Sequence, residues 1–294
     1  MAAIGVTKTR LEDQRFVIYG AGSAGLGIAR QLRDAILSTS DNQQITGEEA
    51  NSRFWLVDKH GLIKESIVAS GQVRQDLMEF VRKEESFQSS DESGLLEVVK
   101  QVKPTVLIGC STHAGAFTQE VVEAMQEGLG EQGRPIIFPL SNPSRLVEVT
   151  PEDAYRWTKG RALIATGSPF DPVGEEKYEI AECNNALIYP GLGLGSIISQ
   201  SKSLTDTMII AGAQRLAALA PSLKDPTAAL LPDFADAPEV NLEVAVAVIE
   251  QAIKEGSAGG SVNGWSEEEI RDRVREKVWK PVYGTYVYDE AGME

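Results

Sequence analysis

A strand, a glycine turn and a helix follow one another over residues 15–30, in the sequence RFVIYGAGSAGLGIAR. The run FVIY at 16–19 is apolar, β-branched and aromatic, which predicts a buried strand. Gly20, Gly22 and Gly25 then form the pattern G-x-G-x-x-G, and apolar residues recur after them at helical spacing. A dinucleotide site requires these elements in this order, whereas an ordinary glycine-rich βα turn is the alternative. The stretch therefore predicts a βα unit with nucleotide-binding geometry.

Each position of the glycine turn has its own physical task. Gly20 allows the tight turn, Gly22 lets the backbone approach a pyrophosphate, and Gly25 lets helix and strand pack closely. Ser23 and Ala24 lie between them, where the helix begins. The free N–H groups and the positive dipole end of a helix start attract phosphate. We therefore expect these five residues to hold the pyrophosphate of a dinucleotide.

A second apolar run, FWLV at 54–57, ends in Asp58. An acid at this place accepts hydrogen bonds from ribose hydroxyls and repels a 2′-phosphate, which favours NAD over NADP. It usually stands about 20 residues past the glycines. Here it stands further along, because a polar stretch at 38–52 (a loop or broken helix) intervenes. Lys59 and His60 follow and could soften the repulsion of a 2′-phosphate, so NADP stays open, and Asp58 could also serve only as a turn residue.

Further strands are predicted at 106–109, 136–138, 162–166 and 186–189. Helical patterns alternate with the strands, so we expect an α/β fold: a doubly wound, mostly parallel Rossmann-type sheet with C-terminal helices. Ligands of such sheets bind outside the carboxyl ends of the strands. The segments predicted to share that edge are Gly20–Gly25, Asp58, Cys110–Gly115, Ser141–Pro143 and Gly167–Pro169.

The character of the chain changes at residue 193. We predict a dinucleotide-binding domain over 1–192 and a C-terminal helical extension packed on it over 193–294. The extension is expected to hold helices at 196–201, 205–219, 239–254 and 267–278, with the stripe Leu242, Val246, Ile249 and Ile253 in its core.

Two features of the second half have open interpretations. Gly191, Gly193 and Gly195 either let the backbone approach a ligand at a helix start or support a sharp turn. The aromatic residues near the C-terminus either form a cap or contact another subunit. They are Trp265, Trp279, Tyr283, Tyr286 and Tyr288.

Charge and hydropathy exclude several classes of partner. The chain has 28 Lys and Arg against 43 Asp and Glu, a net charge of −15, which disfavours nucleic acid and anionic membrane surfaces. No apolar run is long enough to span a membrane, and the sequence MAAIGVTKTR lacks the apolar core of a signal peptide. Cys110 and Cys183 are far apart and lack metal-site spacing. Reduced thiols in an intracellular protein are expected, with one disulfide as the alternative.

Amide side chains are the most interesting polar groups near the predicted ligand edge. Asn142 follows a strand, and Asn184-Asn185 begins a glycine-rich segment. Amides offer a donor and an acceptor without charge, which suits a carboxamide, a ribose hydroxyl or a carboxylate, although Asn is also common in turns. His113 also follows a strand and is either a general base or a surface residue. No carboxylate pair or metal-ligand cluster is evident, so the sequence predicts a cofactor site and no convincing acid, base or metal cluster.

Five motifs occur in order along the chain: GAGSAGLGIA at 20–29, WLVDKHGL at 55–62, PLSNPS at 139–144, ATGSPFDPV at 165–173 and CNNALIYPGLGLG at 183–195. Together they resemble the NAD(P)-binding portion of malic enzyme, over nearly the whole chain. Malic enzymes oxidise L-malate with NAD or NADP and decarboxylate it to pyruvate and CO2, using Mg2+ or Mn2+. The resemblance implies this chemistry for the full-length protein.

The resemblance also implies roles for single residues. The glycine turn matches the family's pyrophosphate loop, and Asp58 matches the acid that ends its second strand. Asn142 and Asn185 match amides that lie by the nicotinamide and the malate carboxylates, so both are expected to bind cofactor and substrate. Ser168 matches a loop lining the same cleft, and Lys59 adjoins the acid.

The departures from the family are informative as well. Malic enzymes carry their catalytic Tyr and Lys and their acidic metal ligands upstream of this region, so the resemblance implies no catalytic residue and no metal ligand in this chain. The segment at 110–115 also differs from the family's glycine-rich loop, which leaves the role of His113 open. A homo-oligomer located in the cytoplasm or a mitochondrion is expected.

Two functions of different classes follow. The first is the NAD-binding domain of a malic enzyme that lacks the N-terminal catalytic half and is inactive alone. The alternative is a non-catalytic NAD-binding or interaction module. Another dehydrogenase, such as an amino-acid dehydrogenase, is a third possibility, against which the SNP and NNA motifs argue.

Overall fold

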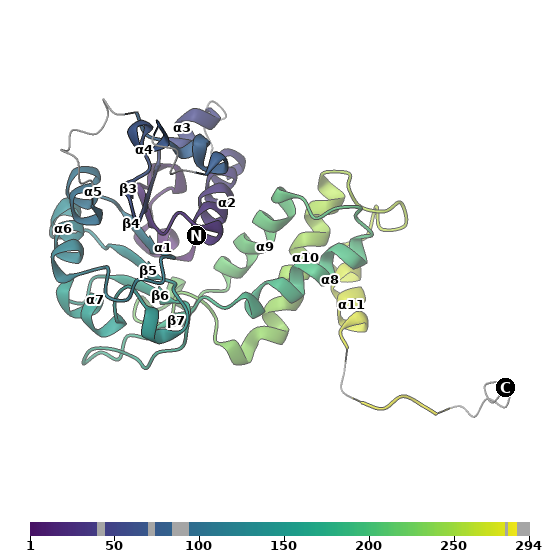
Figure 1. Cartoon of the computed structure of the whole chain (residues 1–294). Helices are drawn as coiled ribbons and strands as arrows, with labels where there is room; N and C mark the ends of the chain where they lie inside the picture. Colours follow the sequence, from purple (N-terminus) through teal and green to yellow (C-terminus); the bar gives the residue numbers. More distant parts are fainter. Residues whose placement is uncertain (40–44, 70–73, 84–93, 280–281, 287–294) are drawn as a thin grey trace, which may run out of the picture.

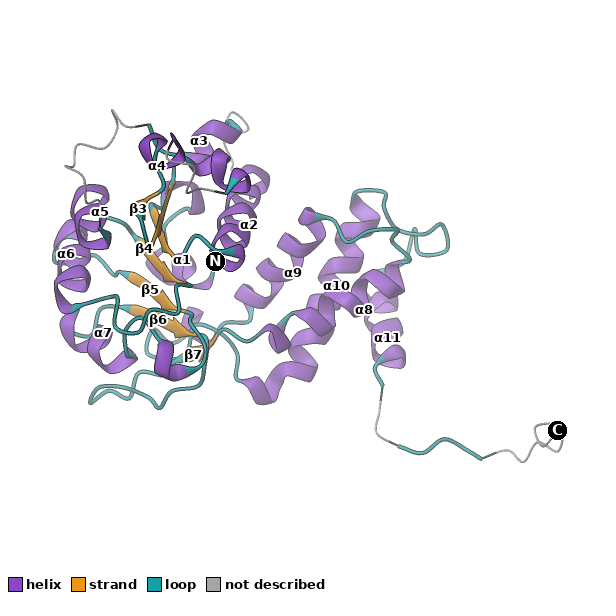
Figure 2. Ribbon diagram, viewed as in Figure 1, coloured by secondary structure: helices purple, strands orange, loops and turns teal. Residues whose placement is uncertain are grey.

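A computed structural model describes residues 1–39, 45–69, 74–83, 94–279 and 282–286. Within these residues seven strands form one sheet, in the order β3-β2-β1-β4-β5-β6-β7 (Figure 2). The strands are β1 (Phe16–Tyr19), β2 (Phe54–Asp58), β3 (Gly61–Leu62), β4 (Val106–Gly109), β5 (Ile136–Pro139), β6 (Leu163–Thr166) and β7 (Ala181–Glu182). All neighbouring strands are parallel except β2 and β3, which form an antiparallel pair.

Helices cover both faces of the sheet (Figure 1). Those before residue 160 are α1 (Ala2–Thr7), α2 (Ser23–Thr39), α3 (Gly47–Asn51), α4 (Glu65–Ala69), α5 (Leu95–Val102), α6 (Gln119–Leu129) and α7 (Pro151–Trp157). Side chains of β1 alternate between two cores: Ile18 packs with apolar residues of α2, and Val17 packs with those of α5 and α6. This alternation explains why the parallel strands are continuous apolar runs, since both of their faces are buried.

The connections establish the doubly wound fold that the sequence predicts. From β1 the chain passes to β2 on one side, and β4 then begins on the other side of β1. The strand order therefore reverses between β1 and β4, and a crevice forms at such a switch point. Several predicted helix starts are confirmed as well, because the hydroxyls of Thr118 and Thr150 accept the backbone N–H groups that begin α6 and α7.

The second half of the chain is helical, with α8 (Tyr189–Ser199), α9 (Asp206–Ala218), α10 (Ala237–Lys254) and α11 (Glu267–Lys277). Figure 1 shows these helices beside the sheet domain. The predicted stripe is confirmed as core: Leu242, Val246 and Ile249 are buried and Ile253 is partly buried. α10 packs against the other three helices. The predicted domain boundary at residue 193 falls within α8 and stays a prediction.

The predicted strand at 186–189 is wrong. Residues Asn185–Leu187 form a 3-10 turn, and α8 begins at Tyr189, well before the predicted helix at 196–201. A short apolar run fits a strand and a buried helix equally well. Pro190 in the first turn is the signal for a helix start.

Two further segments can be compared with their predictions, and the first agrees with the broken-helix alternative. Part of the polar stretch at 38–52 forms α3, which a capping box between Thr46 and Glu49 begins; residues 40–44 lie outside the described residues. The aromatic cap is wrong for Trp279, Tyr283 and Tyr286, which are 81%, 91% and 83% exposed.

Trp265, in contrast, packs on the α10 core, while Tyr288 lies outside the described residues. The subunit-contact alternative for the exposed aromatic residues stays a prediction. Among the helices that the structure describes, none is both long and apolar enough to cross a membrane.

Candidate functional site

Six parallel strands end at one edge of the sheet, and the predicted site residues follow those ends. Along this edge the order is Asp58 after β2, the glycine turn after β1, the 110–115 loop after β4, Asn142 after β5, Ser168 after β6 and Asn185 after β7. The structure therefore brings all the predicted segments to one side of the molecule. They span the switch point between β1 and β4, where ligands of such sheets bind.

The glycine turn is tightly packed where the backbone bends and open where a ligand would approach. Gly20 has φ +105°, and a Cβ there would lie 2.5 Å from the carbonyl oxygen of Cys110. A Cβ on Gly25 would lie 2.0 Å from the carbonyl oxygen of Gly20, whereas one on Gly22 would meet nothing within 4 Å. Gly22, Ser23 and Ala24 are exposed at the start of α2. Because first-turn N–H groups have no partner inside a helix, this shape fits a pyrophosphate.

Asp58 is half-buried at the end of β2, beside the glycine turn. The N–H of Gly20 donates to the carbonyl of Val57 (2.8 Å), which joins the turn to this strand end. One oxygen of the Asp58 carboxyl accepts the N–H of Lys59 at 2.8 Å. A carboxylate has two oxygens and several lone pairs, so this local turn bond is compatible with a ligand bond. Lys59 is exposed at the same end of the strand.

The loops after β5, β6 and β7 carry the other predicted residues. Asn142 is exposed and donates through Nδ2 to the carbonyl of Gly167 (3.3 Å), which links the ends of β5 and β6. Ser168 is buried, and its hydroxyl has no hydrogen-bond partner among the described residues. Asn184 has a structural role, since it accepts the N–H of Ala186 at 3.0 Å. Asn185 is exposed at the edge of the sheet.

His113 and the two cysteines have defined surroundings. The imidazole Nδ1 of His113 lies 3.0 Å from the hydroxyl of Tyr19, and the ring is exposed. Burial raises the pKa of the Tyr19 hydroxyl, and the negative charges of Asp58 and Glu148 raise it further. Burial also raises the pKa of the Cys110 and Cys183 thiols to about 12. Both thiols are therefore neutral at physiological pH, and a neutral thiol is a poor nucleophile.

Glu148 was not identified from the sequence, yet its carboxyl lies directly beneath these loops. It is fully buried and accepts hydrogen bonds from the backbone N–H of Ser111 (2.9 Å) and the hydroxyls of Ser111 (2.8 Å) and Ser141 (2.5 Å). The available signal is the segment RLVEVT, where one acidic residue interrupts an apolar run. A buried carboxyl needs such partners, because burying an unpartnered charge is costly.

The family model described as the malic enzyme NAD-binding domain matches residues 1–253. The chain belongs to the malic enzyme family. It is similar to NAD-dependent malic enzyme 3 of Bacillus subtilis (strain 168), with 42% identity over 94% of this chain and 48% of that protein. It is also similar to the mitochondrial NAD-dependent malic enzyme of Saccharomyces cerevisiae, with 41% identity over 96% of this chain and 43% of that protein.

Solved malic enzyme structures share the fold. The Entamoeba histolytica enzyme has a TM-score of 0.70 at 23% identity, over 94% of this chain and 49% of that one. The Pyrococcus horikoshii enzyme has a TM-score of 0.69 at 22% identity, over 94% of this chain and 55% of that one. This malic enzyme chain thus spans about half the length of the curated relatives it matches.

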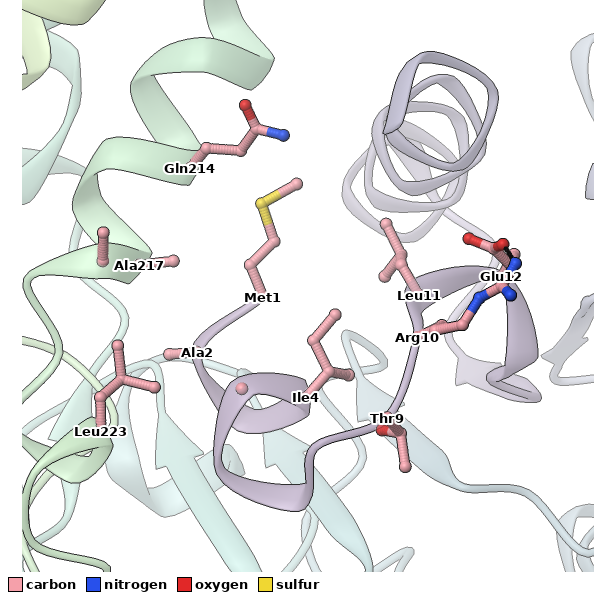
Figure 3. Close-up of a pocket in the computed structure, with 12 residues that line it drawn as sticks. Met1, Ala2, Ile4, Thr9, Arg10, Leu11, Glu12, Gln214, Ala217 and Leu223 are labelled. Carbon is pink, nitrogen blue, oxygen red and sulfur yellow. Dashed lines mark ion pairs between the residues drawn. The ribbon is translucent and has the colours of Figure 1, made fainter. Parts of the chain in front are cut away.

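A separate cavity of about 370 Å³ lies between α1 and α9 of this malic enzyme domain (Figure 3). In Figure 3 Met1 and Ala2 lie next to Gln214 and Ala217 of α9. Arg10 pairs with Glu12 on the side of the cavity away from α9. Its lining includes residues 9–12, which lead into the amino end of β1, and none of the predicted site residues. Within the described residues no cluster of three or more His, Cys, Asp or Glu side chains could hold a metal ion.

Proposed function

We propose that this chain binds NAD along the carboxyl edge of its sheet. The glycine turn holds the pyrophosphate, and Asp58 accepts hydrogen bonds from the adenosine ribose. Asn142 and Asn185 bind the nicotinamide side and the malate carboxylates, with Ser168 lining the same cleft. The observation that carries the proposal is the shape of the turn, which is closed at Gly20 and Gly25 and open at Gly22.

The two halves of the cofactor should lie over different strands. A doubly wound sheet consists of two mononucleotide-binding halves that meet at the switch point. Here β1 and β2 form one half, with the glycine turn and Asp58, while β4, β5 and β6 form the other. The adenosine half of NAD thus lies over β1 and β2, and the nicotinamide half lies over β4 to β6.

The charge of Asp58 favours NAD over NADP, because a 2′-phosphate beside the carboxylate would be repelled. Lys59 is exposed at the same strand end and opposes that repulsion only in part. Both relatives named above are NAD-dependent malic enzymes, which supports the same choice here.

The activity proposed for the whole protein is oxidative decarboxylation of L-malate to pyruvate and CO2, with Mg2+ or Mn2+. In that reaction this chain supplies the nucleotide site, and no described residue is assigned as acid, base or metal ligand. We also propose a homo-oligomer inside the cell, supported by the exposed aromatic residues Trp279, Tyr283 and Tyr286. Light scattering of the purified protein tests the oligomer, and a single-subunit mass would contradict it.

The nucleotide site is tested by calorimetric titration of this chain with NAD, NADP and AMP. NAD should bind more tightly than NADP. Asp58→Ala removes a charged acceptor and should weaken NAD binding by about 1–3 kcal/mol. Asp272→Ala, an exposed acid of α11, is the matched control and should leave NAD affinity unchanged. Unchanged NAD affinity in Asp58→Ala would remove this residue from the site.

A turnover assay separates the two candidate functions. NADH production from malate, NAD and Mn2+ is measured for this chain and for the longest product of its gene. We expect no turnover by the chain alone and turnover by a product as long as the relatives. NAD binding without turnover by that longest product would favour the non-catalytic binding module.

A further inference from the structure

The carboxyl of Glu148 joins two loops that follow neighbouring strands. Its side-chain oxygens accept three hydrogen bonds from Ser111 and Ser141 at 2.5–2.9 Å, and a longer one of 3.4 Å from the Ser141 N–H. Ser111 follows β4 and Ser141 follows β5. In every contact a group of one of the two loops donates and the Glu148 carboxyl accepts. One buried carboxyl therefore holds both loops.

Further hydrogen bonds around this carboxyl either join the two loops or brace the segment that follows β4. The N–H of Thr112 donates to the Ser141 hydroxyl (2.8 Å), and the N–H of His113 donates to the Ser111 hydroxyl (3.1 Å). The backbone carbonyl of Glu148 also accepts the N–H of Phe117 at 2.9 Å. Ser141, which donates to Glu148, is followed directly by Asn142. The Asn142 amide donates to the carbonyl of Gly167 in the loop after β6.

A glycine on β4 leaves room for the carboxyl. A Cβ added at Gly109 would lie 2.4 Å from Cδ of Glu148 and 2.6 Å from one of its oxygens. Any side chain at this position would displace the carboxyl from Ser111 and Ser141. The Glu148 carboxyl therefore occupies the space that the missing side chain of Gly109 leaves, although the two residues lie far apart in the sequence.

We propose that Glu148 is a positioning residue for the nicotinamide half of the NAD site. This inference rests on the proposed function. Glu148 does not touch the cofactor; it sets the loops after β4 and β5 and so the direction in which Asn142 presents its amide. A single buried carboxyl that accepts hydrogen bonds from both loops fixes the two loops relative to each other.

The test measures the affinities of NAD and AMP separately by calorimetry. AMP carries only the groups that reach Asp58 and the glycine turn, so its affinity should respond much less than that of NAD to changes in the loops after β4 and β5. In Glu148→Ala the NAD dissociation constant should rise about tenfold or more, while that of AMP changes by less than about twofold. Glu148→Gln, which keeps one acceptor oxygen, should recover part of the lost NAD affinity.

Milder variants keep the inference testable if Glu148→Ala does not fold. Ser141→Ala and Ser111→Ala each remove a hydroxyl of the network, and Gly109→Ala displaces the carboxyl without altering it. All three should weaken NAD and spare AMP. Glu12→Ala is the matched control: Glu12 is a buried acid paired with Arg10, away from this edge, and its loss should leave the ratio of the two affinities unchanged.

The outcomes separate this inference from the proposed function. Equal weakening of NAD and AMP, or no weakening of NAD, in the loop variants would overturn the role of Glu148 while leaving the NAD site in place. Failure of the unaltered chain to bind either nucleotide would overturn the NAD site and this inference with it.

Discussion

The chain contains two glycine-rich segments, GAGSAG at 20–25 and GLGLG at 191–195, that differ in what their glycines contact. In the first segment backbone meets backbone, as at Gly25, where a Cβ would lie 2.0 Å from the carbonyl oxygen of Gly20. In the second, two helices meet. A Cβ at Gly195 would lie 2.7 Å from Cβ of Val248 on α10. The first segment shapes a turn and the second brings α8 close to α10.

Hydrogen bonding distinguishes the segments too. The N–H of Gly191, in the first turn of α8, donates to Oδ1 of Asn241 on α10 (2.7 Å). The Asn241 side chain thus occupies the helix start at which a bound ligand was one of the two predictions. The other prediction, a sharp turn, is wrong because Gly191, Gly193 and Gly195 all lie inside α8. At the start of α2 the exposed residues Gly22, Ser23 and Ala24 face outward instead. Similar glycine spacing therefore indicates a ligand site only where the helix start is open.

Gly25→Ala should have the largest effect on the comparison. The added Cβ meets backbone, which cannot move aside as a side chain can, so we expect unfolding free energy to fall by about 3 kcal/mol and NAD binding to be lost. Urea unfolding and calorimetry measure the two losses. Gly27→Ala on the same helix is the control, because a Cβ there meets nothing within 4 Å. An unchanged unfolding midpoint in Gly25→Ala would show that the turn relaxes.

Gly195→Ala should affect stability alone. Its Cβ would press on the Val248 side chain and lie 2.9 Å from the carbonyl oxygen of Ala245, which forces α8 away from α10. Overpacking of this kind costs about 1–3 kcal/mol of unfolding free energy. AMP affinity should stay within about twofold, since the contact is remote from the glycine turn. A larger loss of AMP affinity would mean that the helical half supports the adenosine site.

Local patterns explain how much of the fold could be predicted. The strands β1, β2 and β4 are short apolar runs, because parallel strands buried on both faces need no polar positions. Thr118 and Thr150 identify helix starts through hydrogen bonds that span only three residues. The ligand edge then follows from the parallel order of the strands, without knowledge of any single contact.

Features that depend on distant partners could not be predicted. Glu148 receives the Ser111 N–H across 37 positions of sequence, and Asn241 receives the Gly191 N–H across 50. Strand β7 has only two residues, too few for a pattern, and the apolar run after it fits a strand as well as the helix start that it forms. For Glu148 and Asn241 the partner lies on another element, so spacing along the chain does not identify the contact.

Gly22→Ala should weaken NAD binding without destabilising the fold, and so separates the two roles of the glycine turn. A Cβ on Gly22 meets nothing within 4 Å and φ is not positive, so unfolding free energy should not fall. The methyl group would stand where the pyrophosphate approaches the backbone. NAD affinity should therefore fall about tenfold, or about 1.4 kcal/mol. NAD binding at full affinity would place the phosphates elsewhere on the edge.

Gly193→Ala should have the smallest effect, and it should raise the free energy of unfolding, whereas Gly25→Ala and Gly195→Ala lower it. Gly193 is exposed within α8, and a Cβ there also meets nothing within 4 Å. Alanine restricts the unfolded backbone and is the better helix former, so unfolding free energy should rise by about 0.5–1 kcal/mol. NAD affinity, measured beside Gly22→Ala, should not change. Gly22 and Gly193 are equally open in the structure, so a loss of NAD affinity in Gly193→Ala would place a ligand at α8 and remove the distinction between the two segments.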